Sequence, residues 1–90
     1  MDIVWDQAKA KSNYARHGIR FSEVEFVFYD PSALTIEDIG TSREQRFVTI
    51  GRDGMGRVLV VVYTYRGETI RVISARRASP GEVKSYEEGI

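Results

Sequence analysis

The chain has 90 residues, no cysteine, one histidine and 13 acidic against 13 basic residues, so its formal net charge is zero. This composition excludes a disulfide framework, a thiolate zinc site and a multi-histidine metal centre. No apolar run reaches the roughly 18 residues of a membrane span, and the acidic N-terminus is unlike a signal peptide. We therefore expect one domain over residues 1–90 in a cytoplasmic protein, with no cofactor, no metal and no membrane contact.

The charges are unevenly distributed along the chain. Residues 1–45 hold five bases and eight acids, a net charge of −3, whereas residues 46–90 hold eight bases and five acids, a net charge of +3. Seven arginines lie between positions 46 and 77, where only two acids occur. Such a segment can present a positive surface to an anionic partner even though the total charge cancels.

The first third of the chain predicts a short strand and two helices. Residues 3–5 form a β-type run, after which Asp6 is placed to cap a helix that ends near His17, with Gly18 as its stop. A second short helix is expected over residues 22–28, opened by a capping box and ended by the Asp-Pro step at 30–31.

The remainder predicts an antiparallel sheet and a final helix. We expect strands at 34–37, 44–51, 58–65 and 69–75, joined by a loop at 38–42, a hairpin at 53–56 and a turn at 66–67. The glycines at 51–56 fit hairpin geometry better than a phosphate-binding loop. Ser79 and Pro80 then begin a helix that runs to about Glu88. The predicted fold is α+β, an antiparallel meander packed with N-terminal helices and a C-terminal helix.

The last strand carries Arg71 and runs out into Arg76 and Arg77. Arginine is seldom buried without a partner, and its planar guanidinium suits bidentate binding of phosphate. Strand alternation places Arg71 and Arg76 on opposite faces unless the strand end twists. RNA phosphate, an acidic partner strand and an internal carboxylate such as Glu44 all remain possible partners.

The first predicted helix has a polar, mostly basic arc that contains Lys9, Asn13, Arg16 and His17. Lys9 and Asn13, four residues apart, could hold a phosphate or orient a carboxylate, or they could form a solvated surface. Histidine is the side chain that ordinarily titrates near neutral pH, so His17 could serve in acid–base chemistry. Its place one residue before the helix stop favours a second role, in which it caps the helix end and offsets its dipole.

Two further positions have both a functional and a structural interpretation. Glu44 and Arg46 point to the same side of their strand, so Glu44 could be a general base beside a phosphate-binding cation. The pair could instead form a cross-strand ion pair of modest value, ~0.2–1 kcal/mol. Tyr86, together with Tyr63 and Tyr65, could stack on bases or could pack in the core.

Taken together, these residues resemble the BrnT toxins of type II toxin–antitoxin modules. The similarity spans nearly the whole chain and is carried by Val4-Trp5-Asp6-x-x-Lys9-x-x-x-Asn13-x-x-x-His17-Gly18-Ile19-x-Phe21, Phe28-x-Asp30-Pro31, Glu44-x-Arg46-Phe47-x-x-Ile50-Gly51, Ile70-Arg71-Val72-Ile73-Ser74-Ala75-Arg76 and Tyr86. The resemblance implies a RelE-like α+β fold and a ribonuclease that inhibits translation and arrests growth. It also implies a BrnA-type ribbon-helix-helix antitoxin as partner, through which alone the complex would contact operator DNA.

The leading hypothesis is a metal-independent endoribonuclease that cleaves RNA by attack of a ribose 2′-hydroxyl on the adjacent phosphate. Such chemistry needs a base, an acid and a cation that stabilises the phosphate charge. The predicted catalytic residues are Glu44, Arg46, Arg71, Lys9 and His17. The predicted RNA-binding residues are Arg76, Arg77, Asn13 and Tyr86. The alternative is a non-catalytic RelE-like module that binds an acidic protein or RNA.

Overall fold

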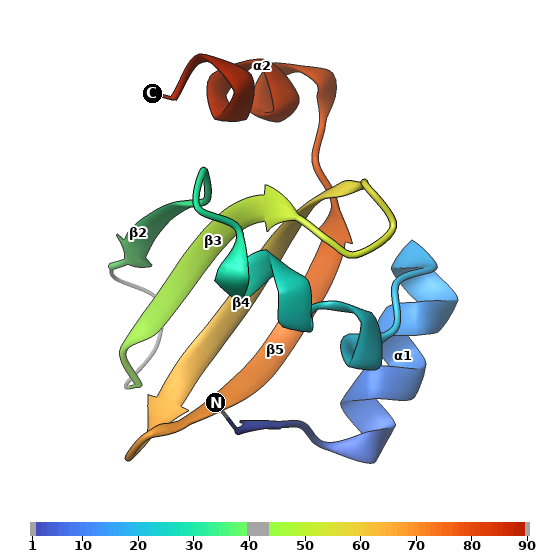
Figure 1. Cartoon of the computed structure of the whole chain (residues 1–90). Coiled ribbons are helices and arrows are strands. Elements are labelled where there is room, and N and C mark those ends of the chain that lie inside the picture. Colours follow the sequence, from blue (N-terminus) through green and yellow to red (C-terminus); the bar gives the residue numbers. More distant parts are fainter. Residues whose placement is uncertain (1, 40–43, 90) are drawn as a thin grey trace.

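The computed structural model describes residues 2–39 and 44–89 and has a mixed α+β architecture built on a five-stranded sheet (Figure 1). The elements in chain order are β1 (Ile3–Val4), α1 (Gln7–His17), η1 (Phe21–Glu23), η2 (Glu25–Tyr29), β2 (Leu34–Asp38), β3 (Arg46–Arg52), β4 (Val58–Arg66), β5 (Thr69–Arg77) and α2 (Pro80–Glu88). The order of strands across the sheet is β1-β5-β4-β3-β2.

Both α-helices begin and end at the residues that the sequence indicated. The Asp6 side chain accepts a hydrogen bond from the Lys9 N–H at 3.0 Å, and Gly18 ends α1 in the left-handed region with φ of 71°. Ser79 accepts a hydrogen bond from the Glu82 N–H, and Pro80 occupies the first position of α2. Local capping therefore fixes both helices.

The predicted second helix is wrong in type, because two short 3₁₀ helices, η1 and η2, replace it. Phe21, Val24 and Val27 are all buried, and their spacing of three residues matches the 3₁₀ period better than the α-helical period of 3.6. The expected capping box from Ser22 is also absent from this described segment. Glu23 instead accepts a hydrogen bond from the Arg20 N–H at 3.0 Å.

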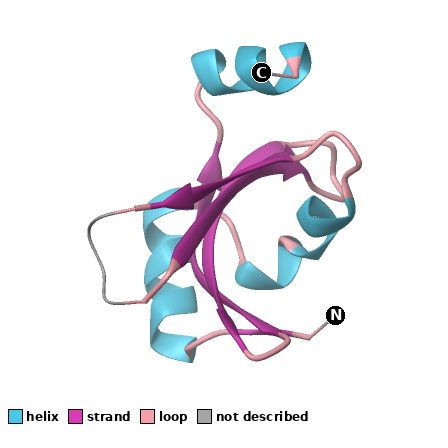
Figure 2. Ribbon diagram, turned by 90° about the vertical axis from the view of Figure 1, so that its left-hand side faces the viewer, coloured by secondary structure: helices cyan, strands magenta, loops and turns pink. Residues whose placement is uncertain are grey.

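Strands β2 to β5 form the predicted antiparallel meander, and β1 adds a parallel strand beside β5. The strand bounds agree with the sequence prediction to within about two residues, while positions 40–42 of the predicted loop lie outside the described residues. One face of β4 and β5 packs against the 3₁₀ segment to form the core. Figure 2 shows the 3₁₀ helices on one side of the sheet and α1 toward the other side.

An irregularity in β5 changes the predicted orientation of its arginines. Tyr63 pairs with Val72 and Val62 pairs with Ser74, so Ile73 is an extra residue in β5. Arg71, which pairs with Thr64, and Arg76, which pairs with Val60, consequently lie on the same face of the sheet. The expectation from straight alternation, that these two arginines point to opposite faces, is therefore wrong.

Candidate active site

The candidate site lies on the sheet face opposite the core, which we call the open face. On the three strands β3, β4 and β5, the register places on it Arg46, Val48, Ile50 and Arg52, then Val58, Val60, Val62 and Thr64, then Arg71, Ser74 and Arg76. Strand β2 adds Leu34, Ile36 and Asp38. Apolar side chains occupy the middle of this face. Arginines occupy both ends of it.

Arg46 and Arg71 flank Thr64 in one row across three strands. Thr64 pairs with Arg71, and its hydroxyl donates a hydrogen bond to the Gln45 carbonyl at 2.6 Å, next to Arg46. Both arginines are half-buried, and the Arg46 Nε is buried without a hydrogen-bond partner. A partly buried guanidinium with unused donors is chemically suited to an oxyanion such as phosphate.

Neither Arg46 nor Arg71 forms an ion pair with an acid anywhere in residues 2–39 and 44–89. Asp38 is the cross-strand neighbour of Arg46, yet the two charges do not form a salt bridge. Glu44, which the sequence offered as an internal partner for Arg71, instead binds Arg66 with an N–O distance of 3.1 Å. The carboxylate of Glu44 is thus held two residues before Arg46 at the same end of the sheet.

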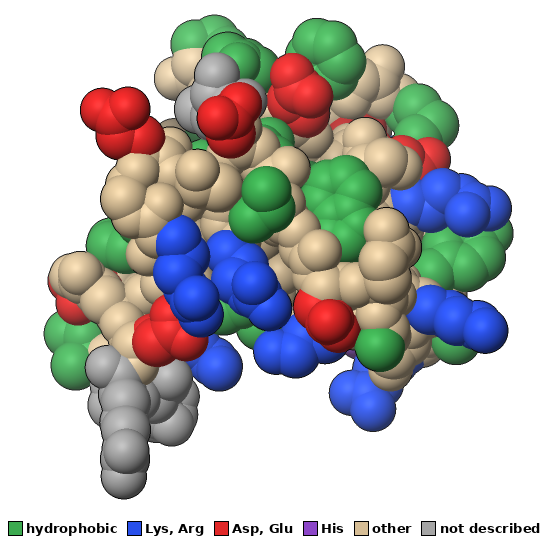
Figure 3. Space-filling view, turned by 90° about the horizontal axis from the view of Figure 1, so that it is seen from below, with side chains coloured by type: hydrophobic (Ala, Val, Ile, Leu, Met, Phe, Trp, Pro, Cys, Tyr) green, Lys and Arg blue, Asp and Glu red, His purple; other side chains and the backbone are tan. Residues whose placement is uncertain are grey.

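A groove between α1 and β5 adjoins this row of arginines. It has a volume of about 170 Å³ and is lined by Lys9, Ser12, Asn13, Arg16, His17, Ile73 and Ser74. Ile73 lies two residues beyond Arg71, which corresponds to roughly 7 Å along a strand. Figure 3, the view from below, shows Lys and Arg side chains gathered over the lower part of the picture, on the side away from the 3₁₀ helices. The structure therefore brings predicted catalytic residues of α1, β3 and β5 to one side of the molecule.

Asn13, which the sequence offered as an RNA contact, is buried and has a structural role in the fold. Its side-chain amide donates hydrogen bonds to the carbonyls of Ile19 at 3.0 Å and Ala75 at 2.8 Å, and its Oδ1 accepts one from the Ala75 N–H at 3.1 Å. The two bonds to Ala75 are those that a neighbouring strand would make. Beyond the end of β1, the Asn13 side chain thus provides hydrogen-bond partners for backbone groups on the exposed edge of β5.

Arg76 and Tyr86 are also engaged within the fold. Arg76 forms a bidentate ion pair with Glu82, with N–O distances of 2.7 and 2.9 Å. These hydrogen bonds lower the pKa of Glu82 to about 2. Tyr86 is buried and donates a hydrogen bond to Asp30 at 2.5 Å, and this bond, together with burial, raises the pKa of the tyrosine. Both residues therefore hold α2, whereas Arg77 at the end of β5 is exposed.

Two residues of the site were not among the sequence predictions. Ser74 lines the groove because the β5 irregularity places it on the open face, a feature that alternation does not predict. Arg66 anchors Glu44 through the β3–β4 register, which the hairpin at 53–56 could have indicated. Arg16, by contrast, shares the helical arc of Lys9, and the sequence pattern does place it there.

Two other kinds of feature, a metal site and a membrane-spanning helix, are absent from the described residues. Within the described ranges, no three His, Asp or Glu side chains are arranged to hold a metal ion. The same ranges contain no helix that is long and apolar enough to cross a membrane.

The molecule is thus a mixed α+β protein whose open face carries Arg46 and Arg71, which pair with no acid among the described residues, an arrangement chemically suited to an anion. Comparison with known proteins makes this assignment specific. The family described as "Ribonuclease toxin, BrnT, of type II toxin-antitoxin system" matches residues 5–82. The crystal structure of the Brucella abortus ribonuclease toxin BrnT is similar, with 34% identity and a TM-score of 0.71 over 88% of this chain and 97% of that one. No curated protein sequence matches significantly.

The chain therefore belongs to the BrnT family of ribonuclease toxins of type II toxin–antitoxin systems. Membership in such a family implies a protein antitoxin as its partner.

Proposed function

We propose that this toxin cleaves RNA without a metal ion, using the end of the open face that carries Arg46 and Arg71. The observation that carries the proposal is that both guanidinium groups are half-buried with no carboxylate partner in the described chain, and that Nε of Arg46 lacks any hydrogen-bond acceptor. Burying such groups is unfavourable unless a ligand compensates. A phosphate held between them would supply the missing acceptors.

The reaction assigned to this site is transesterification. The ribose 2′-oxygen attacks the adjacent phosphorus, a bond forms between O2′ and phosphorus, and the bond from phosphorus to O5′ breaks. Arg46 and Arg71 stabilise the negative charge that develops on the phosphate oxygens. The products are a 2′,3′-cyclic phosphate on one fragment and a 5′-hydroxyl on the other.

Proton transfer is assigned to residues at either side of the arginine row. Glu44 accepts the 2′-hydroxyl proton, and its ion pair with Arg66 keeps the carboxylate at this end of the sheet. Lys9 or His17, which line the groove beside β5, donates a proton to the leaving 5′-oxygen. Arg77 is exposed at the opposite end of β5 from Arg71 and pairs with Leu59, so it would contact RNA beyond the row of Arg46 and Arg71.

The chemical identity of the RNA ends tests this reaction. Purified toxin is incubated with a defined RNA in excess EDTA, and the fragments are analysed by mass spectrometry. We expect cleavage to persist and the new ends to carry a 2′,3′-cyclic phosphate. Fragments with 3′-hydroxyl ends, or activity that EDTA abolishes, would contradict the proposal. RNA that binds without being cut would identify a non-catalytic binding module instead.

We further infer that the antitoxin is a BrnA-type ribbon-helix-helix protein. We also infer that the toxin has a RelE-like fold and that it inhibits translation in the cytoplasm. The support is the family membership, together with the cationic open face, to which an acidic antitoxin segment is complementary. Contact with operator DNA would come from the antitoxin. Co-expression with the neighbouring gene should restore growth and yield a stable complex, and a toxin that remains lethal beside that gene would contradict the pairing.

A further inference from the structure

A second basic pocket lies on the other side of α1 from the groove of the candidate active site. It has a volume of about 460 Å³, which is within the range of small-ligand sites. Its lining includes aromatic, amide and basic side chains, namely Trp5, Gln7, Lys11, Tyr14 and Arg20. Three of them, Gln7, Lys11 and Tyr14, lie on the helical arc opposite Lys9 and Asn13. The two basic regions therefore flank one helix.

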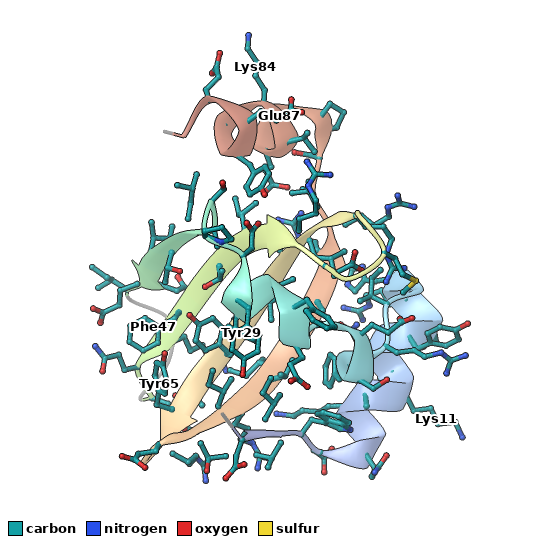
Figure 4. All side chains as sticks on the ribbon, in the orientation of Figure 1. Lys11, Tyr29, Phe47, Tyr65, Lys84 and Glu87 are labelled. Atoms are coloured by element: carbon teal, nitrogen blue, oxygen red, sulfur yellow. The ribbon has the colours of Figure 1, made fainter. Side chains whose placement is uncertain are left out.

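Aromatic and cationic side chains line this pocket together. The Arg20 guanidinium lies over the Tyr14 ring, 4.1 Å from its centroid. Trp5 is half-buried and fixed by an edge-to-face contact with Phe21, with ring centroids 6.3 Å apart. Lys11 extends from α1 away from the sheet (Figure 4). None of the described residues that line the pocket is acidic, so the charges of Lys11 and Arg20 are not offset within it.

We propose that this pocket binds a nucleotide of single-stranded RNA that flanks the cleaved phosphodiester. An aromatic surface accepts an unstacked base, and adjacent cations bind the backbone phosphate, which is the usual pattern of single-strand recognition. The base lies against Trp5 and Tyr14, while Lys11 and Arg20 bind phosphate. Because α1 with its side chains is about 10–12 Å across, this nucleotide lies outside the scissile pair. The identity of the ligand rests on the proposed RNA-cleaving function.

Trp5 gives a direct readout of occupancy because it is the only tryptophan in the chain. The probe is an eight-nucleotide single-stranded RNA with 2′-O-methyl groups, which removes the attacking hydroxyl and prevents cleavage. We expect titration to quench the Trp5 fluorescence. Lys11→Glu and Arg20→Glu should each weaken binding by about five- to tenfold. Lys84→Glu is the matched control, since Lys84 is exposed on α2 and points away from the sheet (Figure 4).

Cleavage kinetics separate this pocket from the catalytic face. Lys11→Glu and Arg20→Glu should raise KM about tenfold for an eight-nucleotide RNA and leave kcat/KM for a dinucleotide unchanged. If KM of the two variants for the longer RNA is unchanged and RNA does not quench Trp5, the pocket does not bind RNA, even if the chain cleaves RNA. Conversely, quenching that the two variants abolish would support the pocket even if no RNA were cut. Quenching only by an added protein partner, and not by RNA, would also overturn the assignment.

Discussion

Four arginines of this molecule form two pairs that differ in whether an acid partners them. Arg57 binds Asp53 at 2.7 Å and Arg76 binds Glu82 at 2.7 Å, so both charges are compensated inside the fold. Arg46 and Arg71 are half-buried on the open face and have no such acid among the described residues. The first group stabilises a hairpin and a helix, whereas the second is available to an external anion.

Asn13→Ala should lower the free energy of unfolding by about 2–4 kcal/mol, because it leaves the Ala75 backbone groups and the Ile19 carbonyl without partners. Urea denaturation measures this change. Ser12→Ala, at the exposed neighbouring position on α1, should change stability by less than about 0.5 kcal/mol. Equal stability of the two variants would contradict the structural role of Asn13.

Tyr86→Phe should lower stability by about 1–2 kcal/mol, since it removes the hydrogen bond to the Asp30 carboxylate. Although burial alone would raise the pKa of Asp30, hydrogen bonds from Tyr86 and from the backbone of Arg52 and Ser32 lower it. Loss of the tyrosine hydroxyl should therefore move the Asp30 pKa upward, as NMR titration of the carboxyl carbon can detect. Tyr29→Phe, at an exposed tyrosine, is the control.

At the scale of the elements, several polar contacts join α2 to the rest of the fold. The Arg76–Glu82 pair joins it to β5, and the Tyr86–Asp30 bond joins it to the segment after η2. Arg52 of β3 also lies near the Tyr86 ring, 5.6 Å from its centroid. Because these contacts involve ionised groups, the attachment of α2 should depend on pH.

Glu82 sets the pH range of that dependence. Its folded pKa of about 2 lies below the ordinary glutamate value of 4.5, so its ion pair contributes stability above pH 4.5 that is lost as the pH falls toward 2. The contribution should be about 1 kcal/mol, because both partners are partly exposed. Between pH 5 and 3, the Glu82→Gln variant should therefore lose less stability than the parent protein, by this amount. Glu87→Gln, exposed on the same helix, should leave it; indistinguishable pH profiles would contradict the assignment.

Elements whose signals are local could be predicted from the sequence. The Asp6 and Ser79 caps, the Gly18 stop and the Pro80 start gave both α-helices correctly. The 3₁₀ segment was missed because an apolar spacing of three residues fits either helix type over so short a stretch. What decides between them is how that segment packs on the sheet, which is a tertiary effect.

For the candidate site, the sequence indicated which residues lie close together better than it indicated what each residue does. Arg46, Arg71 and Glu44 do lie at one end of one sheet face, as strand parity suggested. The role of Asn13 depends on a strand edge 62 positions away, and no local pattern reports that contact. Likewise, the extra residue at Ile73 redirects Arg76 without a glycine or proline to mark it.

Across the whole molecule, the net charge is zero, but basic side chains gather on one side. If RNA binds the open face and the second basic pocket, several phosphates are neutralised and counterions are released. We expect the logarithm of the binding constant for an uncleavable single-stranded RNA to fall linearly with the logarithm of salt concentration. Three to four phosphate contacts correspond to a slope of about −2 to −3. A slope near zero would contradict electrostatic binding of the RNA backbone.

The most direct measurement of the central claim is the single-turnover cleavage rate of Arg46→Ala and Arg71→Ala on one defined RNA. Each variant should fold as the parent does, because neither arginine forms an ion pair within the described chain, and each should cleave about 100-fold more slowly. Lys84→Glu serves as the folded control and should retain the parent rate. Folded Arg46→Ala and Arg71→Ala proteins that both cleave at the parent rate would contradict the assignment of the open face as the active site.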